Sequence, residues 1–171
     1  NPVAYLALAR FYLRRNRLSD SEKALQEAIA TGLKDKSLYH ALGLIQHKKK
    51  DYQAALKSFK DAVSASPNDQ KSLILLADYY IFLKDYPKAK ATYEKVAEKW
   101  PQLMPVKSKI AELFIAERDY DQALAQVQKI LAEDPDYARG YVLRGLLWLK
   151  KGETNKARDQ FLKARDLDPS S

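Results

Sequence analysis

The amino-acid sequence predicts an all-α protein, a right-handed α-solenoid superhelix made of five helix-turn-helix repeats. Three observations support this fold class. The chain has 171 residues and matches itself at one fixed shift, which brings Pro67 onto Pro101 and then onto Pro135. Each 34-residue block contains two apolar runs with the spacing of one helix face. Only 5 residues are glycine, which disfavours turn-rich β architectures and glycine-loop nucleotide folds.

The repeat period divides the chain into five blocks, at residues 2–35, 36–69, 70–103, 104–137 and 138–171. Equivalent positions carry a proline, a small residue, a second small residue and a large apolar residue. In that order the columns are Pro67, Pro101, Pro135 and Pro169; Ala9, Gly43, Ala77, Ala111 and Gly145; Ser21, Ala55, Ala89, Ala123 and Ala157; and Leu25, Phe59, Tyr93, Val127 and Phe161. Because the blocks and Asn1 account for all 171 residues, we expect a single domain over residues 1–171.

The first helix of each block is predicted from its apolar face, as the second block illustrates. The residues at i, i+3, i+4 and i+7 of that face are Tyr39, Leu42, Gly43 and Gln46. The run is interrupted at residues 50–52, where Asp51 is a candidate N-cap for the next helix. Asp85 and Asp119 stand at the equivalent positions of the following blocks, so we expect the same turn there.

The second helix of the block carries Ala55, Phe59 and Ala62 on one face and ends before Pro67. In the third block Pro87 falls in the first helical turn, where the missing N–H does no harm. A glycine or alanine on the first helix that faces an alanine on the second lets the two backbones approach closely. The aromatic column then fills the remaining space. One helix pair buries too little apolar surface alone, so the pairs must stack on one another.

These columns resemble the tetratricopeptide repeat (TPR) family over residues 2–171. The positions that match its pattern are Tyr39, Leu42, Gly43, Ala55, Phe59, Ala62 and Pro67, and then Tyr141, Gly145, Ala157, Phe161, Ala164 and Pro169. The departures are Leu33, Gln46, Lys107 and Arg144. The sequence of residues 131–152 resembles the repeats of bacterial TPR lipoproteins and export-assembly factors. The resemblance implies a protein–protein interaction scaffold that holds a peptide or helix of a partner in its concave groove, within a larger assembly.

The sequence shows no catalytic constellation, so we expect no enzyme activity, no cofactor and no metal. Cysteine is absent, which excludes disulfides, thiolate zinc sites and cysteine nucleophiles. The two histidines, His40 and His47, lie two helical turns apart, so they stand about 10 Å apart along one helix. That distance is too long for one zinc ion, and we interpret both as polar groove or surface residues. Acidic pairs such as Glu133 and Asp134 fall at helix ends, where capping explains them.

The face of each first helix opposite its buried arc is the predicted peptide groove. Its residues are Arg10, Arg14, His40, Leu44, His47, Lys71, Ile74, Asp78, Ile81, Phe82, Lys109, Glu112, Arg139, Val142 and Leu146. The many aliphatic side chains favour either a groove floor that buries partner side chains or packing between adjacent first helices, and both readings stay open. Phe82 is the best candidate for an exposed contact, because its column is otherwise mainly basic or small.

Some TPR proteins clamp the terminal carboxylates of chaperones with five polar residues spread over three repeats. The aligned places in the first three blocks hold Leu6, Arg10, Ala41, Lys71 and Leu75. Three of the five are apolar, and the later registers also fail. We therefore reject recognition of chaperone tails.

A basic edge is predicted at the ends of the first helices. Besides Arg14 of the groove, it consists of Arg15, Arg17, Lys48, Lys49, Lys50, Lys84, Arg118, Lys150 and Lys151. The chain has 30 basic and 22 acidic residues, a net charge of +8. Cations at helix C-termini stabilise the helix dipole, which explains the edge structurally. The alternative is a module that binds RNA or another anion, but no aromatic stacking pattern accompanies the edge, which argues against nucleic acid.

The longest apolar stretches fall far short of the roughly 20 residues of a spanning helix, so we expect no membrane span. Neither the composition nor the absence of cysteine decides between the cytoplasm and a bacterial periplasm or outer-membrane-associated location. Asn1 is not an initiator methionine, so we expect a processed chain or an excised piece. No polar capping helix follows Pro169, so we expect the array to continue or to associate with itself through apolar ends.

Overall fold

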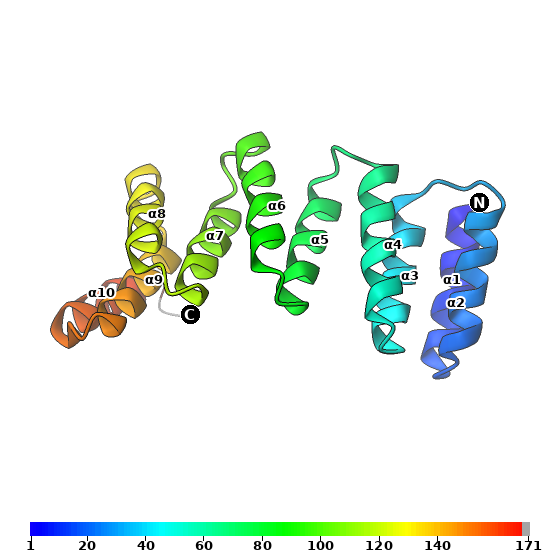
Figure 1. Cartoon of the computed structure of the whole chain (residues 1–171), viewed down its shortest axis with the longest axis horizontal. Coiled ribbons are helices and arrows are strands. Elements are labelled where there is room, and N and C mark those ends of the chain that lie inside the picture. Colours follow the sequence, from blue (N-terminus) through cyan, green and yellow to red (C-terminus); the bar gives the residue numbers. More distant parts are fainter. Residues whose placement is uncertain (169–171) are drawn as a thin grey trace. The chain divides into compact units, whose positions relative to one another are not determined.

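The computed structural model describes residues 1–168, and every regular element in that range is an α-helix (Figure 1). The helices are α1 (Pro2–Arg14), α2 (Leu18–Ala30), α3 (Lys36–Lys48), α4 (Tyr52–Ala65), α5 (Gln70–Phe82), α6 (Tyr86–Lys99), α7 (Met104–Ala116), α8 (Tyr120–Glu133), α9 (Ala138–Lys150) and α10 (Thr154–Leu167). Each predicted block therefore holds two helices, which confirms the all-α prediction. The predicted closing residue Pro169 lies outside the described range.

The chain divides into two compact units, Asn1–Leu83 and Lys84–Ser171. The division falls between α5 and α6, inside the third repeat. Within the first unit consecutive helices from α1 to α5 pack against one another, and within the second unit the same holds from α6 to α10. The prediction of one domain over the whole chain stays a prediction.

The turns between the two helices of a repeat share one backbone geometry. Asn16, Lys50, Lys84, Arg118 and Gly152, which occupy equivalent positions of the five repeats, all have positive φ, between 57° and 80°. In the second repeat the Asp51 N–H donates to the Gln46 carbonyl and the Lys50 N–H donates to the His47 carbonyl, both at 2.9 Å. This pair of bonds is a Schellman motif, which ends α3 and satisfies its last carbonyls.

The residue after the positive-φ position then starts the next helix. Side-chain oxygens of Asp51, Asp85 and Asp119 accept hydrogen bonds from the backbone N–H groups of Ala54, Lys88 and Gln122, at 3.1, 3.3 and 3.2 Å. The predicted N-caps are confirmed. Pro87 lies in the first turn of α6, also as predicted. Because the same few residues end one helix and cap the next, the repeat period predicts where the first helix of each repeat ends and where the second begins.

The core of the first unit lies where α1, α2 and α3 meet. Its buried members are Ala9, Leu25, Ala28, Leu38, Leu42 and Ile45. Leu38 and Ile45 are buried in addition to the predicted Leu42, Gly43 and Gln46, while Tyr39 is only half-buried, so the buried arc of α3 is wider than the predicted one. The reason is that α3 contacts both α2 and α4, and two neighbours bury a wider arc than one.

The second unit has an equivalent core between α7, α8, α9 and α10. Its buried members are Ala111, Ala123, Val127, Leu131, Tyr141, Leu143, Leu147 and Ala164. The glycines inside helices, Gly43, Gly140 and Gly145, face large side chains directly. A Cβ atom on Gly43 would lie 3.0 Å from the Phe59 ring, and one on Gly140 would lie 2.6 Å from Leu131. The prediction that Gly43 faces an alanine is therefore corrected, since the glycine makes room for the aromatic ring itself.

Gln46 departs from the family pattern because it joins two repeats through polar contacts. The Ser58 hydroxyl donates to Gln46 Oε1 at 2.7 Å, and Gln46 Nε2 donates to Glu22 Oε1 at 3.1 Å. Lys49 Nζ donates to the other oxygen of Glu22 at 2.5 Å. A tyrosine could not complete this network, so the departure replaces an apolar contact with a buried polar one.

The other departures also have structural explanations. The buried Lys107 forms an ion pair with Glu133 of α8. Arg144 Nε donates to Gln160 at 2.7 Å, and its guanidinium stacks 4.9 Å above the Tyr141 ring centre. The half-buried Leu33 packs on the first core in the connection after α2. Of the helices described within residues 1–168, none is long and apolar enough to cross a membrane.

Candidate functional site

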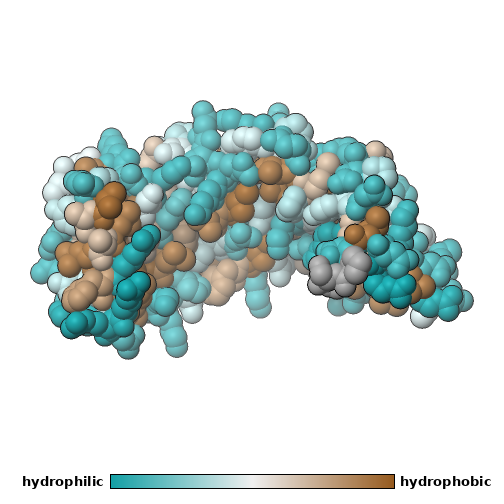
Figure 2. All heavy atoms as spheres, turned by 180° about the vertical axis from the view of Figure 1, so that it is seen from behind, coloured by the Kyte–Doolittle hydropathy of each residue, from teal (hydrophilic) through white to brown (hydrophobic). Residues whose placement is uncertain are grey.

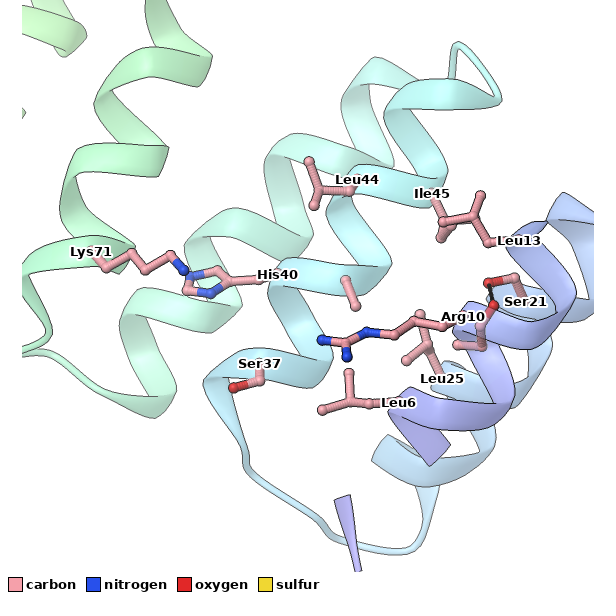
Figure 3. A pocket seen from close by; sticks show the side chains of 12 residues that line it. Leu6, Arg10, Leu13, Ser21, Leu25, Ser37, His40, Leu44, Ile45 and Lys71 are labelled. Atoms are coloured by element: carbon pink, nitrogen blue, oxygen red, sulfur yellow. Dashed lines mark hydrogen bonds between the residues drawn. The ribbon is translucent and has the colours of Figure 1, made fainter. Parts of the chain in front are cut away.

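The first helices of repeats one to three form the walls of one pocket in the first unit (Figure 3). Its volume is about 340 Å³, within the range of small ligand sites but near its lower end. The lining residues are Leu6, Ala9, Arg10 and Leu13 of α1; Ser21 and Leu25 of α2; Ser37, His40, Ala41, Leu44 and Ile45 of α3; and Lys71 of α5. The repeat period places these residues together, because equivalent faces of α1, α3 and α5 turn to one side.

The pocket floor is apolar and closed by a buried hydrogen bond. Leu25 and Ile45 are buried, and the Ser21 hydroxyl donates to the Ala9 carbonyl at 2.8 Å. Leu44 stands at the rim with 54% of its surface exposed. An apolar floor of this kind favours burial of an aliphatic or aromatic side chain from outside.

The pocket rim carries two cations from different helices. Figure 3 shows the Arg10 side chain extending from α1 toward α3, and the Lys71 side chain extending from α5 toward His40. The lining contains no aspartate or glutamate. Among residues 1–168, no carboxylate forms an ion pair with Arg10 or Lys71. The rim therefore offers positive charge that the described part of the chain does not pair with a carboxylate.

His40 contributes a neutral ring to this pocket. Burial lowers its pKa; the nearby Asp69 opposes that effect, while Lys71 and Lys36 add to it. Its Nε2 atom is buried and has no hydrogen-bond partner within the described chain. The sequence prediction of a polar groove residue is thus refined, because the ring is half-buried and one of its nitrogens is unsatisfied.

His47 lies in a different setting, an aromatic cluster made of His47, Tyr52, Tyr79 and Phe82. Its ring centre is 4.7 Å from that of Phe82 and 5.6 Å from that of Tyr52. Phe82 is 47% exposed, as its column suggested, but it also packs edge-to-face against Tyr52. Phe82 therefore does not stand alone on the surface, because it packs in a cluster with the exposed Tyr52, the half-buried His47 and the buried Tyr79.

The predicted groove residues all keep some exposure, since none of the fifteen is fully buried. Half-buried are His40, His47, Ile74, Ile81, Glu112 and Val142; exposed are Arg10, Arg14, Leu44, Lys71, Asp78, Phe82, Lys109, Arg139 and Leu146. The structure brings Arg10, His40, Leu44 and Lys71 together in the pocket. In the second unit Glu112 binds both Arg139, at 2.7 Å, and Lys109, at 3.4 Å, so both groove cations share one carboxylate partner.

Sequence reasoning missed several pocket residues, although the repeat period marks them. Leu6 stands one repeat before His40, so it shares a column with a predicted groove residue. Leu13 likewise shares the column of His47. Including every member of each column would have identified them.

The basic edge is exposed throughout, but part of its charge is already paired. Lys49 pairs with Glu22 at 2.5 Å, Lys151 with Asp121 at 2.9 Å and Arg17 with Asp20 at 2.7 Å. The expectation that no aromatic stacking pattern for nucleic acid accompanies the edge stays a prediction, although two of its cations lie over aromatic rings of the same chain. Arg15 stacks over Phe11 and Arg17 over Tyr12, with distances to the ring centres of 4.5 and 4.8 Å. These rings are occupied by cations of the same chain, so they leave little free face for a nucleic-acid base.

Apolar side chains also reach the surface at the ends of the array. Figure 2 shows such side chains among hydrophilic ones where α1 forms the end of the first unit. Val3 is 69% exposed, and Phe11 of the same helix and Leu162 of α10 are also exposed. Self-association through these ends stays a prediction. Residues 1–168 contain no group of three or more acidic, histidine or cysteine side chains that could hold a metal ion.

Paired helices that recur in a regular period define a helical-repeat protein. A family model described as tetratricopeptide repeat matches residues 6–70 and 108–171, and a second one matches residues 46–105. The chain belongs to the tetratricopeptide repeat family. Members of this family are typically protein–protein interaction modules and are generally non-catalytic. A search of curated protein sequences finds no significant match.

Solved structures with the same fold cover nearly the whole chain. A tetratricopeptide repeat protein from Parabacteroides merdae is 20% identical with a TM-score of 0.81, over 98% of this chain and 67% of that one. MamA from Desulfovibrio magneticus is 19% identical with a TM-score of 0.76, over 99% and 96%. YrrB, described as a protein with an unusual peptide-binding site, is 19% identical with a TM-score of 0.70, over 99% and 88%. At these identities the likeness concerns the fold.

Proposed function

We propose that the chain is a non-catalytic scaffold that binds a peptide or helix of a partner protein on the face formed by its first helices. The single observation that carries this proposal is the pocket between α1, α3 and α5, where an apolar floor is open to solvent beside the exposed Leu44. A partner side chain seated there would bury Leu44 together with the apolar floor, and removing this apolar area from water is favourable. The peptide-binding site ascribed to YrrB supports the same use of this fold.

The pocket is small, which bears on the binding strength. One or two anchored side chains give modest affinity, on the order of micromolar, or about −8 kcal/mol. A scaffold of this kind gains further affinity when several sites are engaged at once, as in a larger assembly. We therefore assign the chain to an assembly in which the pocket is one contact among several.

The test is selection of binding peptides from a random display library on the immobilised chain, followed by affinity measurement on two variants. Leu44→Asp places a charge at the pocket rim. Leu8→Asp is the matched control, because Leu8 is an exposed leucine of α1, 39% exposed, that does not line the pocket. We expect the selected peptides to bind Leu44→Asp at least about tenfold more weakly and Leu8→Asp unchanged, a difference of about 1.4 kcal/mol. Equal binding to both variants would contradict the proposal.

A further inference from the structure

The strongest unassigned feature of the molecule is the charge balance of the pocket between α1, α3 and α5. Arg10 and Lys71 approach it from α1 and α5, no acidic residue lines it, and neither cation has an ion-pair partner within residues 1–168. The groove cations of the second unit differ, because Lys109 and Arg139 both pair with Glu112. The pocket of the first unit thus keeps a positive charge that an external partner can neutralise.

The surroundings of the two cations explain why their charge is not already satisfied. Lys36 of the neighbouring turn is paired with Asp69, and Asp35 caps α3 through the Ser37 N–H at 2.7 Å. The nearby carboxylates are therefore committed to other groups. Because His40 is neutral, the net charge of the lining is that of Arg10 and Lys71 together. An anionic ligand group therefore faces a lining whose own charges are positive, although the charges of Asp69 and Asp35 still act at His40.

The volume of the pocket and the position of its charges limit the size and the composition of an anionic segment that can bind there. A cavity of about 150 Å³ is enough for benzene, so about 340 Å³ holds one large apolar side chain and part of its neighbours. The apolar residues form the floor and the cations stand at the rim. A complementary segment therefore carries a bulky apolar residue in the middle and acidic residues on its flanks.

We infer that the pocket recognises an internal segment of a partner protein in which a bulky apolar residue is flanked by acidic residues. This inference rests on the proposed function and adds the chemistry of the bound segment. It differs from a clamp for a chain terminus, because Leu6 and Ala41 occupy places where such a clamp has polar groups, and both line the apolar part of the pocket. Flanking carboxylates of side chains suffice to pair with Arg10 and Lys71.

The test uses short synthetic peptides with blocked ends and a fluorescent label, measured by anisotropy against the whole chain. The reference peptide has leucine between two glutamates on each side. The second replaces the glutamates with glutamine, the third replaces the leucine with serine, and the fourth is the glutamine peptide with a free C-terminal carboxylate. We expect the second, third and fourth peptides each to bind about tenfold more weakly than the reference.

Protein variants locate the interaction. The double variant Arg10→Gln with Lys71→Gln should lose about tenfold in affinity for the reference peptide and should no longer distinguish it from the glutamine peptide. The matched control is Lys23→Gln with Lys60→Gln, which removes the same charge from exposed residues of α2 and α4 outside the pocket. The preference for glutamate should also fall as salt rises, because charges at an open rim are screened.

The outcomes separate this inference from the proposed function. If library peptides depend on Leu44 but the glutamate and glutamine peptides bind alike, the charge recognition is wrong while groove binding stands. If the free-carboxylate peptide binds best, the site is a terminus clamp and the inference is overturned. The inference is also overturned if the double variant at Arg10 and Lys71 and the control double variant at Lys23 and Lys60 bind the reference peptide equally well. Dependence on the leucine, on the glutamates and on Arg10 with Lys71 together supports it.

Discussion

Gly145 of α9 faces the ring of Phe161 of α10 so closely that a Cβ atom on the glycine would lie 2.5 Å from the ring. At the equivalent place in repeat two, the corresponding distance from Gly43 to the Phe59 ring is 3.0 Å. In repeat four the same two positions hold Ala111 and Val127, a larger and a smaller residue. In repeats two, four and five the small and large columns therefore vary together, because each pair fills one space between the helices of a repeat; repeat three departs, with Ala77 and Tyr93.

Gly145→Ala should destabilise the chain by about 1–2 kcal/mol. An alanine inside a helix usually adds roughly 0.5–1 kcal/mol of stability over glycine, but overpacking against a ring costs about 1–3 kcal/mol. The second term is larger at 2.5 Å. Urea denaturation of Gly145→Ala and of Gly145→Ala with Phe161→Val measures the effect. The smaller valine should make room for the alanine methyl group, as in repeat four, so the double variant should lose less stability than the sum of the two single losses. If the losses in unfolding free energy simply add, the two positions do not share a space.

Lys50→Gly and Arg118→Gly should each stabilise the chain by about 0.5–1 kcal/mol. Both residues have positive φ, 64° and 62°, which costs an L-residue about 1–2 kcal/mol, and glycine avoids that cost at some expense in chain entropy. The fifth repeat already has Gly152 at this position. Lys49→Gly serves as control and should destabilise, because Lys49 has φ of −75° and the variant also loses the ion pair with Glu22. The prediction fails if thermal melting ranks the three variants otherwise.

Gln46→Leu should cost about 1–3 kcal/mol, because the buried Ser58 hydroxyl loses its acceptor. Adding Ser58→Ala should restore part of the loss, since no polar group then remains unpaired on that side. Gln53→Leu, on the exposed face of α4, is the control and should be near neutral. A double variant no more stable than Gln46→Leu alone would mean that the Glu22 contact carries the effect.

The repeat period explains why so much of the fold could be predicted. Asp51 and its equivalents mark the turn in every copy that carries them, so helix boundaries follow from the alignment of the chain with itself. The repeat period does not predict which residues of a helix are buried, because that depends on both of the helices that pack against it. That is why Leu38 and Ile45 were missed as buried residues of α3.

The sequence predicts which helix face carries the candidate site, but it does not predict which charged side chains of that face form ion pairs. Arg10, His40, Leu44 and Lys71 were expected on the groove side, and the structure joins them in one pocket. Whether a side chain on that face is free depends on contacts between repeats, such as the pairing of Glu112 with Arg139, 27 residues away. A helical wheel shows direction only, so it treats paired and unpaired cations alike.

Asp69→Asn should destabilise the chain at pH 5 and make little difference near pH 2. Burial alone would raise the pKa of Asp69, but hydrogen bonds from the Lys36 ammonium and from the Ser72 side chain and backbone outweigh it and lower the pKa from 3.8 to about 2. The pKa is depressed in the folded state, so the stabilisation is present above about pH 4 and is lost as pH falls toward 2. Its size is roughly 1–2 kcal/mol, allowing for the partly exposed Lys36. Urea midpoints at the two pH values measure it, and an equal loss at both would contradict it.

Stability should also fall as pH drops through the range where histidine titrates, because of His40. Burial is the main cause of its lowered pKa; Lys71 and Lys36 lower it further, while Asp69 and Asp35 partly compensate. The unfolded chain therefore takes up a proton near pH 6.5, before the folded chain does, and protonation favours unfolding. His40→Gln removes the titration and should flatten the dependence of the unfolding free energy on pH between about pH 7 and 5. Urea denaturation of both proteins across that range decides the matter, since equal slopes would place the pH sensitivity elsewhere in the chain.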